Sequence, residues 1–285
     1  MLIRLSLGLL WLLHFLPLPL LRALGSGFGL LLWAVGRERR RVTQTNLRLC
    51  FPELSEAERN RLTREHFRYF GKSFMDRALL WHASADRLRR LIRFSSPLPP
   101  AEDGPYLVFS PHFVGMDAAW TGLTLQRQML AIYSSQKNPV FDATLYAGRT
   151  RFNQPNLLSR QDGIRQAIKG LREIPYFYYL PDMDFGPKNA MFIPFFGTPA
   201  ATITALPWLA GLAKAKVLPC LAEMTESGYT IHFLPPWTDY PTGDTAADTR
   251  RMNAFIEEQV RRWPAQYYWL HKRFKTRPPG DPKLY

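Results

Sequence analysis

Residues 106–120, YLVFSPHFVGMDAAW, contain the transition on which the predicted fold depends. The first five residues predict a short buried strand, and the pattern from Met116 onward is helical. The loop between them carries His112, and Asp117 follows five residues later. In α/β folds a loop at the carboxyl end of a strand lies where ligand crevices form. The stretch therefore predicts an α/β sheet with a ligand site at His112.

The same alternation continues along the rest of the chain. Four further apolar runs are typical of strands, and helical patterns lie between and after them. This alternation predicts an α/β domain with a mixed sheet flanked by helices. The strand candidates are 129–134, 176–180, 216–224 and 229–234, and the helix candidates are 116–128, 139–152, 161–172, 204–215 and 248–263.

The N-terminal segment has the composition of a membrane anchor. The 17 residues LSLGLLWLLHFLPLPLL, at the short end of what spans a bilayer, precede Arg22, a second apolar run and the basic cluster GRERRR. A cleavable signal peptide is the alternative, because Arg4 supplies a charged start, but the apolar character continues past any cleavage point. Pro17 and Pro19 would kink a helix, which leaves a partly interfacial segment open as well.

A helical region follows the anchor and precedes the α/β core. Ser55 and Glu58 match a capping box that begins an amphipathic helix, and the turn-rich SSPLPPAEDGP ends the region. We expect a membrane anchor over residues 1–35 and a catalytic domain over 36–285, divided into a helical entry region at 36–95 and an α/β core at 105–285.

Charge and cysteine content limit the classes of partner. The 285 residues include 37 Lys and Arg against 23 Asp and Glu, a formal charge of +14 that favours acidic lipids, carriers, phosphorylated substrates or nucleic acid. No ordered mixture of basic and aromatic residues matches a nucleic-acid module. Cys50 and Cys220 form no C-x-x-C, which argues against a disulfide framework or a thiolate zinc site.

Three groups of polar residues are candidates for chemistry. His112 and Asp117 fit an oriented general base, although spacing alone favours a loop histidine beside a carboxylate that complements the helix dipole. Asp182 and Asp184 form a D-x-D after a strand, a pattern of metal-dependent glycosyltransferases that local turn chemistry also explains. Arginines in a third stretch, AGRTRFNQPNLLSRQDGIR, would bind phosphate or carboxylate if they line a crevice.

Several blocks in this order resemble the late acyltransferases of lipid A biosynthesis, within the lysophospholipid acyltransferase superfamily. The family's hallmark is a His followed after four residues by an acidic residue, here His112 and Asp117. The resemblance covers nearly the whole chain. The blocks are SPHFVGMD, QKNPVFDATLYAGRTRF, RQDGIRQAIKGL, LPDMDFGPKNAMFIPFFGTPAAT and YYWLHKRFKTRPPG.

The resemblance implies a glycerol-3-phosphate-acyltransferase-like α/β fold and a bacterial inner-membrane enzyme with its catalytic domain on the cytoplasmic face. Such an enzyme moves a fatty acyl chain from acyl carrier protein onto the hydroxyl of a 3-hydroxyacyl chain in a lipid A precursor of the Kdo2-lipid IVA type. It implies an acidic carrier protein and a phosphorylated glycolipid as partners, and no nucleic acid, metal, cofactor or covalent acyl-enzyme.

The resemblance also implies roles for single residues. His112, oriented by Asp117, would remove the hydroxyl proton, and backbone N–H groups near Gly115 or an arginine would stabilise the oxyanion. Arg149 and Arg160 would bind substrate phosphate.

Asp182 would have a local structural role or form an ion pair.

Three alternatives stay open. The acceptor could be another lipid, such as a lysophospholipid, aminolipid or glycolipid. The chain could instead be a D-x-D glycosyltransferase, or a non-catalytic lipid-binding or scaffolding protein.

Overall fold

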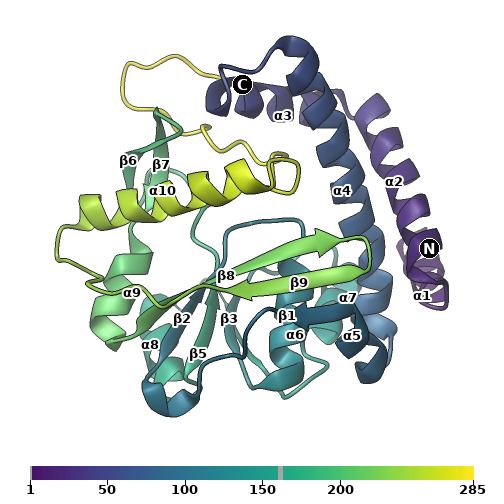
Figure 1. Cartoon of the computed structure of the whole chain (residues 1–285), viewed down its shortest axis with the longest axis horizontal. Coiled ribbons are helices and arrows are strands. Elements are labelled where there is room, and N and C mark those ends of the chain that lie inside the picture. The colour runs from purple at the N-terminus through teal and green to yellow at the C-terminus, as the bar shows by residue number, and fades with distance from the viewer. Residues whose placement is uncertain (1, 160–162) are drawn as a thin grey trace.

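The computed structural model describes residues 2–159 and 163–285. In this part of the chain a seven-stranded sheet lies at the centre, helices cover both of its faces, and a two-stranded hairpin stands apart from it (Figure 1). The strands are β1 (Ile92–Phe94), β2 (Tyr106–Phe109), β3 (Leu130–Tyr133), β4 (Asn156–Ser159), β5 (Tyr176–Tyr179), β6 (Ala190–Phe195), β7 (Thr198–Ile203), β8 (Lys216–Thr225) and β9 (Gly228–Phe233).

Helices form most of the N-terminal third and both flanks of the sheet. They are α1 (Leu2–Leu13), α2 (Leu18–Val35), α3 (Arg37–Cys50), α4 (Glu56–His82), α5 (Ala85–Leu91), α6 (Met116–Gln126), α7 (Pro139–Arg149), α8 (Gly163–Glu173), α9 (Ala205–Ala213) and α10 (Thr245–Arg262), with a short 3₁₀ turn at Ala101–Asp103. The predicted capping box is present on α4, where Ser55 and Glu58 bond each other's backbone N–H.

The sheet is mixed, as the sequence predicts. Its strand order is β1-β9-β8-β2-β5-β3-β4, with β2 parallel to both β5 and β8. Strand β9 runs antiparallel to β8, and β1 pairs in parallel with β9. The carboxyl ends of β2 and β5, two neighbouring parallel strands, therefore meet at one edge of the sheet.

The core lies on both faces of the central strand. Side chains of a strand point alternately to opposite faces, so Tyr106 and Val108 of β2 join the cluster that contains α4 and α6, and Leu107 and Phe109 join the cluster under α9 and α10. All four are at most 2 % exposed. Burying each such side chain contributes roughly 1.5–3 kcal/mol, so β2 is held firmly from both sides.

Helix α2 packs on α4 through glycines. A Cβ built on Gly29 would lie 2.0 Å from the carbonyl oxygen of Phe67, and one on Gly71 would lie 2.1 Å from that of Gly25. The two backbones are thus in direct contact, a spacing that only glycine permits. Figure 1 shows the result, with α2 running beside α4 along one edge of the molecule.

The same helix has the composition of a membrane anchor. Among the described residues, Leu18–Val35 is the helix that is long and apolar enough to cross a membrane by length and composition. Its buried Arg22 reaches into the α/β core, where it bonds the Asp76 carboxylate at 3.1 Å and the Gly228 carbonyl at 3.0 Å. Tyr229 donates to the same carboxylate at 2.7 Å. The apolar segment is therefore joined to the sheet by polar bonds as well as by packing.

The substitution Gly29→Ala tests this packing. We expect it to lower the free energy of unfolding by about 1–3 kcal/mol, because the added methyl group must push the two helices apart. Gly27→Ala is the matched control, since a Cβ there meets nothing within 4 Å and alanine favours the helix. Thermal unfolding of the full chain in detergent measures both, and equal midpoints for the two variants would contradict the close approach.

Candidate functional site

The site begins with the register of β2 and β5. Phe109 pairs with Tyr179 in this parallel ladder, and each strand ends there and continues into a loop with a proline. His112 and Asp182 each lie three residues beyond the paired positions. Equal offsets from an in-register parallel pair place the two side chains next to each other at the edge of the sheet.

The Asp182 carboxylate makes three hydrogen bonds, two with His112 and one with Tyr267. The imidazole Nδ1 lies 2.5 Å from Oδ1 of Asp182, and the backbone N–H of His112 donates to Oδ2 at 3.0 Å. The hydroxyl of Tyr267 donates to the same Oδ2, also at 3.0 Å. Because the carboxylate engages Nδ1, Nε2 is the ring nitrogen that can take up a proton from a ligand.

The carboxylate of Asp182 is kept ionised despite its burial. Its side chain is fully buried, and burial by itself raises the pKa, but the charge and hydrogen bonds of His112, helped by Arg273, outweigh this and hold the pKa below its usual value. A buried anion fixed at Nδ1 sets the tautomer of the ring and stabilises the imidazolium that forms when Nε2 is protonated.

The partner of His112 is thus Asp182, and the expected contact between His112 and Asp117 is wrong. Asp117 lies in the first turn of α6, where Arg77 of α4 and Arg149 of α7 each donate to its carboxylate at 2.8 Å. Two guanidinium groups from other helices therefore engage Asp117, while the neighbouring parallel strand supplies the carboxylate for the imidazole.

This arginine-flanked carboxylate is also an anion in the folded protein. Burial of Asp117 tends to raise its pKa, but the charges and hydrogen bonds of Arg149 and Arg77 hold that pKa far below the usual range. The side chain of Arg149 is 27 % exposed and its buried Nε has no hydrogen-bond partner within the described part of the chain. Asp117 therefore holds Arg149 at the site, and the Nε–H of that arginine is left without a partner among the described residues.

The loop of His112 is fixed at several points of its backbone. Ser73 of α4 donates to the Val114 carbonyl at 2.7 Å, and the His112 carbonyl accepts from the Tyr268 N–H at 2.9 Å. Gly115 has no room for a side chain, since a Cβ there would lie 2.6 Å from the Ala222 carbonyl oxygen. The loop is therefore rigid on both sides of the imidazole.

Gly115 is the N-cap of α6, and no side chain caps the helix there. The first turn of a helix presents backbone N–H groups without intrahelical partners and carries the positive end of the helix dipole. In this protein that end lies three residues from His112. The N–H of Met116 in this turn already donates to the Phe113 carbonyl at 3.0 Å, and the expected role of Gly115 toward a negatively charged oxygen stays a prediction.

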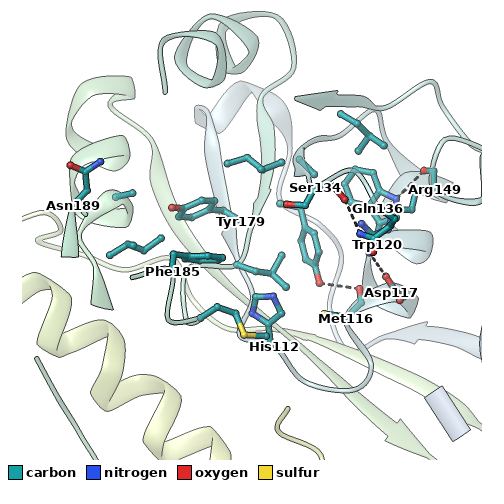
Figure 2. Close-up of a pocket in the computed structure, with 18 of the residues that line it drawn as sticks. His112, Met116, Asp117, Trp120, Ser134, Gln136, Arg149, Tyr179, Phe185 and Asn189 are labelled. Carbon is teal, nitrogen blue, oxygen red and sulfur yellow. Dashed lines mark hydrogen bonds and ion pairs between the residues drawn. The ribbon is translucent and has the colours of Figure 1, made fainter. Parts of the chain in front are cut away.

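A cavity of about 1030 Å³ opens over the imidazole. Figure 2 shows His112 between two groups of lining side chains. Tyr179, Phe185 and Asn189 lie on one side, and Asp117, Trp120, Ser134, Gln136 and Arg149 lie on the other. The apolar lining also includes Met183, Ile203, Ala205 and Trp208. This volume is at the upper end of the range for ligand pockets, so the cavity accommodates a large, partly apolar ligand.

The D-x-D carboxylates do not converge. Asp182 is hydrogen-bonded to His112. Asp184 accepts hydrogen bonds from the N–H and hydroxyl of Thr276 and from the Gly186 N–H, at 2.7–2.9 Å. No group of three or more potential metal-ligating His, Cys, Asp or Glu side chains occurs among the residues that the structure describes. Asp184 holds the C-terminal tail rather than facing the same space as Asp182.

Sequence reasoning missed two residues of the site, Arg77 and Tyr267. Arg77 and Tyr267 lie 40 and 85 residues from the carboxylates that they bond, so only the packed fold brings them there. The contact between His112 and Asp182 can be predicted from the sequence, because FSPH and YLPD both place an ionisable residue directly after a strand and a proline. Arg160 lies outside the described residues.

The chain matches known proteins over nearly its whole length. The family model for bacterial lipid A biosynthesis acyltransferases matches residues 1–276. The lipid A biosynthesis lauroyltransferase of Escherichia coli is 32 % identical over 291 residues, which cover 99 % of this chain and 94 % of that protein. The lipid A biosynthesis myristoyltransferase of the same organism is 34 % identical over 275 residues, covering 94 % and 83 %.

A solved structure is also similar to the chain. The crystal structure of the 1-acyl-sn-glycerophosphate acyltransferase PlsC from Thermotoga maritima has a TM-score of 0.39 and 14 % sequence identity, and the alignment covers 86 % of this chain and 95 % of that one.

The substitution Asp117→Asn tests the electrostatics of the site. We expect it to cost on the order of 3 kcal/mol at pH 7, because two part-buried guanidinium groups lose the buried anion that they share. A carboxyl group with a lowered pKa stabilises the fold above its ordinary pKa and loses that effect as the pH falls, so the difference between wild type and variant should shrink below about pH 4. Denaturant unfolding at several pH values measures it.

Asp86→Asn is the control, because that carboxylate forms an exposed ion pair with Arg89. It should change the free energy of unfolding by well under about 1 kcal/mol. An Asp117→Asn effect as small as this, or one that does not depend on pH, would contradict an ionised carboxylate between two arginines.

Proposed function

We propose that this chain, which belongs to the bacterial lipid A biosynthesis acyltransferase family, acylates a lipid A precursor of the Kdo2-lipid IVA type. The acceptor is the hydroxyl of a 3-hydroxyacyl chain, and the donor is acyl-acyl carrier protein. The chain is an acyltransferase of lipid A biosynthesis by family. The observation that carries the finer proposal is the His112–Asp182 pair beneath a large cavity with an arginine-bound carboxylate beside it.

His112 is the general base of the proposed reaction. Its Nε2 takes the proton of the acceptor hydroxyl while the oxygen attacks the thioester carbonyl carbon and a new C–O bond forms. Asp182 holds Nδ1 and stabilises the imidazolium. As the C–S bond breaks, the proton on Nε2 passes to the departing thiolate, so no proton or electron pair is left over.

The negative oxygen of the tetrahedral intermediate requires donors. Two groups near His112 suit this role: the N–H groups at the start of α6, beginning at Gly115, and the guanidinium of Arg149 that Asp117 holds beside the cavity. Donors that are fixed before the reaction act without reorganisation, which is why such groups are effective. Asp117 thus serves the reaction by positioning Arg149, and Arg77 serves it by sharing Asp117.

The cavity and the charge of the chain suit the proposed substrates. The apolar side, with Phe185 and Trp208, is suited to a fatty acyl chain, and the side with Arg149 to phosphate-bearing groups of the acceptor. A formal charge of +14 favours both an acidic carrier protein and a phosphorylated glycolipid. We place the protein at the bacterial inner membrane with its catalytic domain on the cytoplasmic face, because the basic cluster after the apolar segment is attracted to the anionic lipids of that leaflet.

The substitution Asp182→Asn tests the proposed dyad. We expect kcat for acyl transfer to fall on the order of 10²- to 10⁴-fold with a smaller change in KM, because the amide no longer stabilises the imidazolium. The assay uses the full-length protein in detergent with lauroyl- or myristoyl-acyl carrier protein and Kdo2-lipid IVA. Mass spectrometry of the lipid product measures the transfer, and circular dichroism checks that the variant is folded.

The matched control is Glu223→Gln. Glu223 bonds His232 at 3.0 Å in a half-buried pair outside the cavity, so this variant also removes the carboxylate partner of a histidine. Its rate should equal that of wild type. If a folded Asp182→Asn protein keeps the wild-type kcat, the dyad is wrong, and if wild type acylates a lysophospholipid but not Kdo2-lipid IVA, the acceptor is wrong.

Arg149→Gln separates two possible roles of this arginine. If Arg149 binds a substrate phosphate, as we propose, KM for the phosphorylated acceptor should rise on the order of 10-fold while a dephosphorylated acceptor is little affected. Arg127→Gln, at an exposed position, is the control. An equal fall in kcat for both acceptors would instead assign Arg149 to the oxyanion alone.

A further inference from the structure

We infer that α1 and α2 lie flat in one leaflet of the membrane, with a row of cations on α4, Arg64, Arg68 and Lys72, bound to anionic lipid headgroups. This inference rests on the proposed membrane association but on no step of the acyl transfer. It concerns a surface that takes no part in the cavity. Four features of the α2–α4 pair support it.

The cation row flanks α2 turn by turn. The guanidinium of Arg64 stacks on Trp33 at 4.6 Å, while a Cβ on Gly29 would lie 3.1 Å from Cα of Arg68 and one on Gly25 would lie 2.7 Å from Cα of Lys72. Residues four apart on a helix lie on one face, so the three cations form a single line. This line runs beside α2 from Gly25 to Trp33, which is the second half of the helix.

A spanning orientation would place that line in hydrocarbon. Helix α2 has 18 residues and is therefore about 27 Å long, close to the thickness of the hydrocarbon core, so it crosses only if it stands nearly upright. Because α4 is in backbone contact with it, Arg68 and Lys72 would then enter the core together with α2. Charged side chains there are costly and are rarely exposed to lipid.

The opposite face of α2 is a continuous apolar stripe. It contains Leu20, Leu24, Leu31 and Val35, which are 46–65 % exposed, and it continues on α1 with Leu5, Leu9, Trp11, Leu12 and Phe15. An exposed apolar surface of this extent marks a site of contact with another apolar phase. An apolar stripe with cations along its border is typical of a helix that lies in the membrane interface.

Hydrogen bonds and an ion pair attach α1 and α2 to the rest of the protein. Arg22 ties the middle of α2 to Asp76 and to the β8–β9 turn, and Arg87 of α5 donates to the carbonyl groups of His14 and Leu16 at the end of α1. If α2 left α4 to cross the bilayer alone, Arg22 and Asp76 would lose each other inside apolar surroundings. The anchor and the catalytic domain are therefore expected to lie on the same side of the membrane.

The depth of three nitroxide labels decides the orientation. Leu20→Cys, Gly27→Cys and Val35→Cys all lie on the exposed side of α2, and Gly27 is at its midpoint. The full-length variants are placed in vesicles of phosphatidylcholine with phosphatidylglycerol, and the accessibility of each label to oxygen and to a water-soluble nickel complex gives its depth. Wild type is the background, because Cys50 and Cys220 are buried.

We expect three similar, shallow depths. A deep label at Gly27 between two shallow ones at Leu20 and Val35 would show a helix that crosses the bilayer and would overturn the inference. The measurement needs no substrate, so its failure would leave the proposed acyl transfer untouched. A protein with the expected depths and no acyltransferase activity would overturn only the proposed function.

Vesicle flotation tests the cation row. The double variant Arg64→Gln/Arg68→Gln should bind phosphatidylglycerol-containing vesicles on the order of 10-fold more weakly than wild type and should bind pure phosphatidylcholine vesicles unchanged. Arg172→Gln/Lys214→Gln, at exposed positions in α8 and directly after α9, makes the same change in charge and should bind like wild type. Equal losses for the two double variants would contradict a specific headgroup contact.

Discussion

The parallel pairing of β2 and β5 is the constraint on which the site depends. With Phe109 opposite Tyr179, the two loops that leave the sheet are in register, and His112 meets Asp182. A slip of one residue would turn the side chains of the strand to the other face and separate the pair. The four buried side chains of β2 prevent such a slip, so the core of the protein also sets the geometry of the imidazole.

About two turns of α4 connect the membrane-facing surface to the site. Gly71 contacts α2, Ser73 holds the loop of His112, Asp76 binds Arg22, and Arg77 binds Asp117. These four residues contact different neighbours, yet they are fixed relative to one another because they share one helix. The position of the apolar segment and the position of the arginine-bound carboxylate are therefore not independent.

Local pattern predicts five of the seven strands described in the central sheet and the position of His112, but not the short edge strands β1 and β4 or the partner of His112. The strands around 106, 130, 176, 216 and 229 are apolar runs that any packed sheet would bury, and each is present. The β6–β7 hairpin was missed because Pro194 and Pro199, which disfavour a strand, lie opposite each other in it. The sequence favours Asp117 over Asp182 because it shows only neighbours along the chain, whereas strand pairing brings Asp182 to His112 and helix packing brings Arg77 to Asp117.

Mass spectrometry of lipid A from living cells tests the central claim most directly, that His112 is the base of an acyl transfer to a lipid A precursor. Cells without the gene are complemented with wild type or with His112→Ala. We predict that deletion removes the mass of one acyl chain from lipid A, that wild type restores it, and that a folded His112→Ala protein does not. Restoration by His112→Ala, or an unchanged lipid A after deletion, would contradict the account.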